Sequence, residues 1–330
     1  MKCPGLLIRS IMKTLLIADV HIKLGQKNVP KEWAYNRYEL FFKQVAEAEK
    51  QVDQIIIPGD IFDRMPNLDE LKLYFKFIAQ RKKRTIISTG NHESTKKGKS
   101  FFTELKEVSE SLNPLVEVVV DYIFKHDEFY VVPYEYVKHE TTWQDLDPRP
   151  VFTHVRGEIP PHVKPEIPLE WLDKFPVVFA GDLHSHSNTQ RNIVYPGSPM
   201  TTSFHRNEVD TGYIIIDSDW DWTWHAFDLP QLIRRTVTSP EEMVSTDFHH
   251  TIYELEGNIK DLAKIDNTEL LDKKIVKRKS DTALVLDKKM TIPEELAEYL
   301  RYIQELPEDQ VESIMGVFNE YGSTTINRVG

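Results

Sequence analysis

The sequence predicts an α/β fold built on a mainly parallel sheet, and two observations carry this prediction. Short apolar runs, each closed by a polar turn, alternate with longer segments whose apolar residues recur at helical spacing. The short runs are rich in Ile and Val, which is typical of strands that are buried on both faces. Because strands and helices alternate along the chain, parallel pairing through crossover helices follows.

The first third of the chain contains three strand–helix units. We expect strands at 15–17, 54–57 and 85–88 and helices over about 33–50, 68–82 and 99–112. After about residue 115, strands dominate, and we expect them at 116–120, 129–132, 151–154, 177–180, 212–217 and 223–227. Trp220, Trp222 and Trp224 alternate and so share one face of a hairpin, where packing is favoured over base stacking.

The composition changes near Leu229-Pro230 and divides the chain into segments. We expect an N-terminal extension over 1–11, a main α/β domain over 12–230, a small α+β capping domain over 231–291 and a helical tail over 292–330. The cap contains candidate strands at 251–255 and 283–286. Thr291 and Glu294 fit a capping box that opens a helical hairpin broken by Pro307. The hairpin carries apolar stripes at Leu296, Leu300, Ile303, Val311, Ile314 and Phe318.

Charge and cysteine content exclude some classes of protein. The 330 residues include 41 Lys and Arg against 52 Asp and Glu, a net charge of −11, which argues against a protein held on nucleic acid by phosphate contacts alone. An enzyme whose metal ions bring positive charge to the site is still allowed. The single cysteine, Cys3, excludes an internal disulfide and favours the cytoplasm. No apolar stretch approaches the roughly 20 residues of a membrane span.

Local basic runs occur in this acidic chain. We expect most of them to be solvated surface rather than binding sites, and the run at 96–99 is the exception because it follows a predicted site motif. The runs lie at 81–84, 96–99 and 273–279.

Chemically distinctive motifs follow four of the predicted strands. They are Asp19-Val20-His21 and the segments 59–63, 90–93 and 181–184. The carboxyl ends of strands are where α/β sheets place their ligand sites. Five of the twelve histidines, at positions 21, 92, 154, 184 and 186, sit just after predicted strands. The mixed nitrogen and oxygen ligands point to two divalent ions, and to Mn, Fe, Co or Zn more than Mg or Ca.

A pair of metal ions defines the chemistry that these motifs can perform. Two ions roughly 3.5–4 Å apart clamp a phosphate and lower the pKa of a water molecule between them. Asp60 follows a tight turn and is suited to bridge the ions, while Asn91 offers a neutral oxygen. His92 is adjacent to that ligand, which suits a proton donor. No nucleophilic-serine motif and no phosphate-binding glycine loop is present, so we expect hydrolysis by water.

In order and spacing, these motifs resemble the calcineurin-like metallophosphoesterase superfamily. Within it, the chain is similar to the SbcD-type nuclease subunits of bacterial and phage DNA repair complexes, on the segments 59–63, 132–134 and 195–199 and the cap with its helical tail. The resemblance implies two central β-sheets flanked by helices and Mn²⁺-dependent exonuclease and endonuclease activity on DNA, in repair and recombination. It also implies an SMC-like, ABC-type ATPase partner of the SbcC type, with a homodimer inside a heterotetramer. It further implies that 12–230 is the nuclease domain, that the capping domain over 231–291 binds DNA and that the tail over 292–330 binds the ATPase, in the host cytoplasm if the chain is phage-encoded.

Carried over residue by residue, the resemblance implies a ligand set. One ion would be held by Asp19, His21, Asp60 and His184, and the second by Asp60, Asn91, His154 and the residue after Gly181. The family usually has histidine at that last position, and this chain has Asp182. Either Asp182 is the ligand, which we favour, or the turn shifts and His184 and His186 serve. His92 would be the catalytic histidine, with Asp63 fixing its orientation.

Two other interpretations stay open at this point. One is a calcineurin-like phosphatase that acts on a substrate other than DNA, although Met65-Pro66 follows Asp63-Arg64 where protein phosphatases carry glycine. The other is a non-catalytic scaffold that only recruits the ATPase, and the near-complete ligand set disfavours it.

Overall fold

A computed structural model describes residues 12–94, 99–276, 291–304 and 306–326 of the chain. The predicted extension over 1–11, most of the basic run at 96–99 and the candidate strand at 283–286 lie outside the described residues.

The first sheet has six strands in the order β11-β10-β1-β2-β3-β4. Strands β1 to β4 pair in parallel, and β10 and β11 add an antiparallel hairpin next to β1. The mainly parallel α/β arrangement predicted from the alternation is therefore confirmed. The strands are β1 (Thr14–Leu16), β2 (Gln54–Pro58), β3 (Arg84–Ser88), β4 (Val116–Val119), β10 (Gly212–Ile216) and β11 (Trp222–Ala226).

The second sheet has five strands in the order β5-β6-β7-β8-β9, parallel from β6 to β9. Its central strands match the predicted ones, whereas β5 and β9 have two residues each and are too short to show a pattern in the sequence. The strands are β5 (Phe124–Lys125), β6 (Tyr130–Val132), β7 (Val151–His154), β8 (Val178–Gly181) and β9 (Ile193–Val194).

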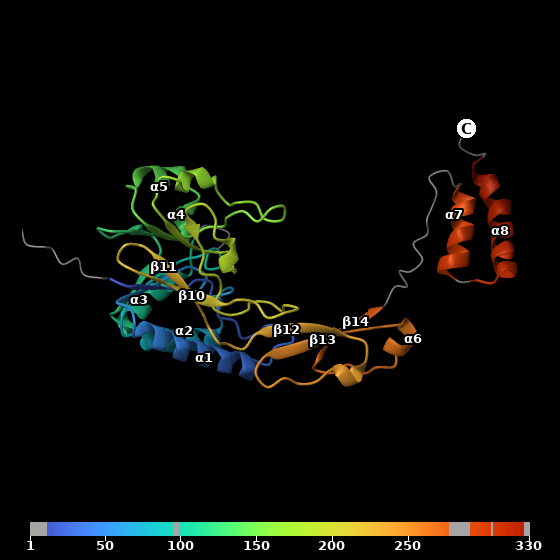
Figure 1. Cartoon of the computed structure of the whole chain (residues 1–330), viewed down its shortest axis with the longest axis horizontal. Helices are drawn as coiled ribbons and strands as arrows, with labels where there is room; N and C mark the ends of the chain where they lie inside the picture. Colours follow the sequence, from blue (N-terminus) through green and yellow to red (C-terminus); the bar gives the residue numbers. More distant parts are fainter. Residues whose placement is uncertain (1–11, 95–98, 277–290, 305, 327–330) are drawn as a thin grey trace, which may run out of the picture. The chain divides into compact units, whose positions relative to one another are not determined.

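Helices flank the two sheets on their outer faces. In Figure 1, α1 and α2 (blue) lie on one side of the sheets and α4 and α5 (green) on the other. A capping box between Asn67 and Glu70 starts α2 at the predicted residue. The helices are α1 (Lys31–Glu49), α2 (Leu68–Ala79), α3 (Phe102–Leu112), α4 (Tyr134–Val137) and α5 (Glu140–Asp145), with 3₁₀ turns at Leu169–Leu172, His186–Asn188 and Pro240–Glu242.

Both faces of the first sheet are buried, and this explains its continuous apolar runs. In β1, Leu15 belongs to the core under α1 and α2, whereas Leu16 belongs to the core between the sheets. The facing strands fill that second core with Phe129, Phe152 and Phe179. The layers are therefore helix, sheet, sheet, helix, and the predicted pair of central sheets is confirmed. Trp220, Trp222 and Trp224 pack against the same core, as the packing interpretation expects.

A smaller three-stranded sheet follows, in the order β12-β13-β14. Its elements are β12 (Leu232–Val237), β13 (His250–Gly257), α6 (Ile259–Leu262) and β14 (Leu271–Val276). The chain divides into two compact units. The first runs to Leu255 and includes Asn267–Lys273, and the second takes in Glu256–Asp266 and the chain from Lys274 onward.

The tail forms the predicted helical hairpin, α7 (Ile292–Glu298) and α8 (Glu308–Ile326), with a π-helical turn at Tyr299–Ile303. Thr291 and Glu294 form the predicted capping box. Leu300 and Val311 are buried, whereas Ile314 and Val317 are exposed. The side chain of Ile303 lies outside the described residues. Within the described ranges, no helix combines the length and apolarity that crossing a bilayer demands.

Candidate metal centre

The predicted ligands come together at the carboxyl ends of five strands from both large sheets. Asp19 and His21 follow β1, Asp60 follows β2 and Asn91 follows β3. The second sheet supplies His154 at the end of β7 and Asp182 and His184 just after β8. Because these strands end at the line where the two sheets meet, residues distant in sequence share one site.

Asp60 lies between two groups of possible metal ligands. Its Oδ2 atom is 3.5 Å from His21 Nε2 and 3.4 Å from His154 Nε2. On one side, His21 Nε2 also lies 3.1 Å from His184 Nε2, so two ring nitrogens face each other. The sets that could hold one ion are Asp19 with His21 and His184, His21 with Asp60 and His92, and Asp19 with Asp60 and His154. A carboxylate that lies between two ligand groups is placed to serve both ions of a metal pair.

Unpartnered buried atoms show that this cluster fits divalent metals. Asp19 Oδ2, Asn91 Oδ1 and His154 Nε2 are buried and have no hydrogen-bond partner among the described residues. Leaving a polar atom buried and unpaired costs about 1–3 kcal/mol. The three atoms are two oxygens and an imidazole nitrogen, the donor set that metals such as Mn²⁺ and Fe²⁺ accept.

Burial perturbs the titration of the ligands in opposite directions. It raises the pKa of the Asp19 carboxyl to about 8. It lowers the pKa of the His21 imidazole well below its ordinary value, with the nearby His184 adding to the effect. A bound cation would favour the carboxylate and the neutral imidazole, which are the forms that ligate metal.

The backbone at the ligands adopts left-handed conformations that side chains rarely take. The φ angles are 55° at Asp19, 47° at His21 and 54° at Asp60. Such residues cost of order 1–3 kcal/mol each and cluster at functional sites. Gly59, with a φ of 91°, is required next to Asp60, because a Cβ atom there would lie 2.5 Å from His154 Nδ1.

His92 sits at the exposed rim of the cluster, with 41% of its side chain accessible. Its backbone N–H donates to Asp60 Oδ1 at 3.0 Å, and its Nδ1 lies 2.6 Å from the carbonyl oxygen of Asp63. Asp63 therefore contacts His92 through its backbone, whereas its carboxylate pairs with Lys23 Nζ at 2.8 Å. With Nδ1 engaged, Nε2 of His92 faces Asp60, 3.9 Å from its Oδ2.

Asp182, and not His186, lies beside the side chains predicted for the second ion. Asn91 Nδ2 donates to Asp182 Oδ1 at 3.0 Å, and His154 Nε2 is 3.6 Å from the same oxygen. His186 instead has its Nδ1 2.6 Å from the carbonyl oxygen of Tyr195 and stacks on Trp224. Because Asn91 contacts Asp182 through Nδ2, its Oδ1 remains available as a metal ligand.

Two residues that support the cluster escape sequence reasoning. Glu93 is fully buried, and its carboxylate accepts the backbone N–H groups of Asp60, Phe62 and Gly90 at 2.8–3.0 Å. Burial raises the pKa of Glu93 to about 8. The position of Glu93 next to His92 in the motif is the sequence feature that could have identified it. Thr202, whose Oγ1 lies 3.1 Å from His184 Nδ1, stands in no motif.

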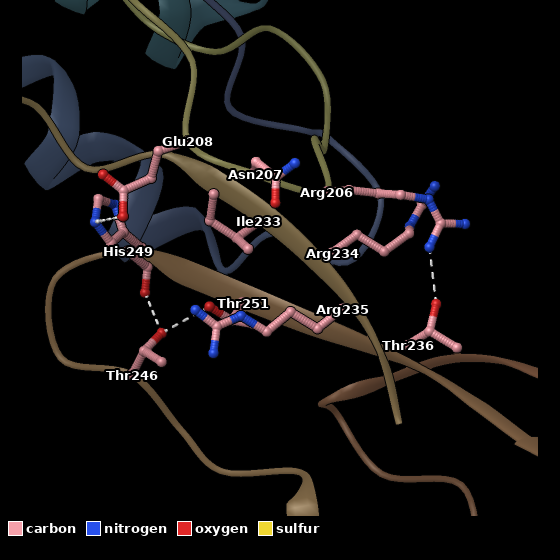
Figure 2. Close-up of a pocket in the computed structure, with 10 residues that line it drawn as sticks. All are labelled: Arg206, Asn207, Glu208, Ile233, Arg234, Arg235, Thr236, Thr246, His249 and Thr251. Carbon is pink, nitrogen blue, oxygen red and sulfur yellow. Dashed lines mark hydrogen bonds and ion pairs between the residues drawn. The ribbon is translucent and has the colours of Figure 1, made fainter. Parts of the chain in front are cut away.

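A separate groove of about 580 Å³ lies on the small sheet and is rich in arginine. Figure 2 shows Arg206 reaching toward Thr236, and the guanidinium group of Arg235 lying near Thr246 and Thr251. Arg234 pairs with Asp272 at 3.0 Å and Arg206 with the buried Glu254 at 3.3 Å. Arg235 has no ion-pair partner within the part of the chain that the structure describes.

The two-sheet fold and the Asp60-centred cluster are typical of metal-dependent phosphoesterases. Residues 12–210 match the calcineurin-like phosphoesterase family, and the chain belongs to it. It is therefore an enzyme, a hydrolase of phosphoester bonds.

The chain is also similar to individual proteins. The chain is 37% identical over 322 residues to the probable exonuclease subunit 1 of Escherichia phage T5, covering 94% of this chain and 98% of that protein. It is 25% identical over 223 residues to the putative phosphoesterase 244L of Invertebrate iridescent virus 6, covering 62% and 75% of the two chains. The solved structure of TT1561 from Thermus thermophilus aligns with a TM-score of 0.42 and 12% identity, covering 66% of this chain and 99% of that one.

Proposed function

We propose that the chain is a Mn²⁺-dependent DNA nuclease, with exonuclease and endonuclease activity, that hydrolyses phosphodiester bonds by a two-metal mechanism. The observation that carries the proposal is the position of Asp60 Oδ2 between His21 on one side and His154 on the other. The 37% identity to a phage exonuclease subunit supports DNA as the substrate.

The ligand residues would hold the two ions on either side of Asp60. Asp19, His21, Asp60 and His184 would hold the first, and Asp60, Asn91, His154 and Asp182 the second. When bound, the ions would clamp the phosphodiester and lower the pKa of a water molecule. His92 in its protonated form would donate from Nε2 to the departing oxygen, because its Nδ1 is held by the Asp63 carbonyl.

The arginine-rich groove supports a polyanionic substrate. The whole chain carries a net charge of −11, so its surface as a whole repels DNA. Arg206, Arg234 and Arg235 all line this groove, and guanidinium groups are suited to bind phosphates. Contacts of this kind give affinity without base specificity.

We also propose that the chain works as one subunit of an SbcCD-like complex for DNA end processing. Its partner would be an SMC-like, ABC-type ATPase, with two copies of this chain in a heterotetramer in the cytoplasm. The relative named as an exonuclease subunit supports assembly with other chains. The exposed apolar residues Ile314 and Val317 of α8 offer a surface for helix-in-groove docking.

Cleavage of labelled DNA tests this function directly. We expect the purified chain to cut single-stranded and duplex DNA with Mn²⁺ and to lose this activity in EDTA. Asp60→Ala should lose both activity and metal, since each ion loses its shared carboxylate. A protein that binds two Mn²⁺ ions but hydrolyses only a phosphomonoester or phosphopeptide would overturn the choice of DNA as substrate.

A further inference from the structure

Asp182 brings a third carboxylate into a cluster that already contains Asp19 and Asp60. It lies just after β8 with a φ of 98°, and its backbone N–H donates to Asp19 Oδ1 at 3.0 Å. Only 7% of its side chain is accessible. Carboxylates this close repel one another, and burial increases the repulsion because water does not screen it.

The two oxygens of Asp182 face different partners. Oδ1 points to the cluster, where Asn91 and His154 contact it. Oδ2 accepts a hydrogen bond from Arg156 Nε at 3.0 Å. Arg156 thus offsets the added negative charge and occupies the oxygen that faces away from Asn91.

The rest of Arg156 is held in place but only partly covered. Its backbone carbonyl accepts the Glu166 N–H at 3.1 Å. Next to it, a Cβ atom on Gly157 would lie 2.7 Å from Gln190 Nε2 and 2.8 Å from Tyr195 Oη, so the turn is closely packed. The side chain is 39% accessible, and its two terminal amines have no hydrogen-bond partner among the residues that the structure describes.

We propose that Arg156 is a phosphate-contacting residue of the active site. It holds Asp182 with Nε, so that Asp182 Oδ1 alone turns toward the second ion, and it offers both terminal amines to a non-bridging oxygen of the substrate phosphate. Guanidinium groups are suited to this double role, since their five donors lie in one rigid plane. This inference rests on the proposed function, because it takes Asp182 as a ligand and a phosphodiester as the substrate.

Steady-state cleavage and metal binding by Arg156→Gln test the proposal. Losing charge-assisted hydrogen bonds to the phosphate should raise KM for DNA about 10- to 100-fold. Calorimetric titration should still find two Mn²⁺ ions per chain, because Arg156→Gln removes no ligand atom. Arg156→Lys should have a KM between those of Arg156→Gln and the unchanged protein, since lysine keeps the positive charge but lacks the planar fork. Arg191→Gln, which removes an exposed partner of Asp173, is the matched control.

A substrate with a methylphosphonate at the cleaved position completes the experiment. Its neutral phosphorus centre lacks one charged oxygen, so Arg156→Gln should weaken its binding, measured by fluorescence anisotropy in Ca²⁺, much less than it weakens binding of ordinary DNA. If Arg156→Gln matches Arg191→Gln on both substrates while the unchanged protein binds Mn²⁺ and cuts DNA, the inference is wrong and the proposed function stands. If the unchanged protein neither binds Mn²⁺ nor cuts DNA, the proposed function itself fails.

Discussion

Asp182 and His186 are four residues apart, yet their environments give them different roles. Asp182 contacts Asn91 and Arg156, whereas His186 packs on Trp224 and contacts the Tyr195 carbonyl. We expect Asp182→Ala to retain one tightly bound Mn²⁺ ion, because the second group loses an oxygen ligand. His186→Ala, the matched control, should retain two. Elemental analysis after gel filtration decides the assignment, and two ions in Asp182→Ala would contradict it.

We expect His92 to act in the chemical step and not in the binding of metal or DNA. Its ring is anchored by the Asp63 carbonyl and lies on the exposed rim. General acid help is worth about 10²–10⁴ in rate, so His92→Gln should lower kcat by that range. Metal content and DNA affinity should stay near those of the unchanged protein. A kcat within twofold of the original would exclude the role of proton donor.

Residue types and motif spacing predicted which side chains meet, but not how they contact each other. Asp63 was expected to orient His92, and the structure shows the contact through its backbone oxygen. The carboxylate of Glu93 fixes three N–H groups, and Thr202 contacts His184 from a segment without a motif. Such contacts depend on turn geometry and on residues distant in sequence, which a linear pattern does not encode.

Among the elements, strands buried on both faces were the most predictable. Runs such as 55–57 are apolar because one side faces the helices and the other the second sheet. By contrast, β12 has the sequence Leu-Ile-Arg-Arg-Thr-Val and carries exposed charges, so it shows no such run. The helices α4 and α5 have four and six residues, too few for a helical period to be visible.

The groove on β12 gives an element-scale prediction for DNA binding. Arg235→Gln removes the arginine that has no ion-pair partner among the described residues. We expect weaker binding to every DNA sequence and a salt dependence, log Kd against log salt, that is shallower by about one unit. Arg149→Gln, which removes an exposed partner of Asp147, should leave the slope unchanged. An unchanged slope in Arg235→Gln would exclude the groove as a phosphate-binding surface.

The pairing of α1 with the turn before β3 gives a prediction for stability. Arg81 opens a basic run expected to be solvated, but it is buried, and its guanidinium lies 3.2 Å from the buried carboxylate of Glu49. Breaking a buried pair by removing one charge costs about 3–5 kcal/mol, so Glu49→Gln should lower the free energy of unfolding by about that amount in urea denaturation. Glu47→Gln, which breaks the exposed pair with Lys50, should cost at most about 1 kcal/mol. Equal losses of unfolding free energy in the two variants would contradict the prediction that the buried pair contributes more.

At the scale of the whole molecule, we expect the tail to be needed for assembly with the ATPase but not for catalysis. A chain that ends at Lys289 lacks α7 and α8. We expect it to remain soluble, to load Mn²⁺ and to cut simple DNA ends, while co-purification with the ATPase and stimulation by ATP are lost. Ile314→Asp should reproduce the loss of co-purification, since Ile314 is exposed on α8. Full ATPase affinity in the truncated chain would place the docking site elsewhere.

The ligand cluster takes residues from two sheets that pack on each other through aromatic and branched side chains. His21 and Asp60 come from one sheet, and His154 and Asp182 from the other. Metal ions at this seam would cross-link the sheets, and chelation would therefore loosen the halves of the domain as well as stop the reaction. A misplacement of about 1 Å can cost a hundredfold in rate. Sliding of one sheet against the other would therefore change the distances between the ligands. It would alter the reaction rate without any contact to the substrate.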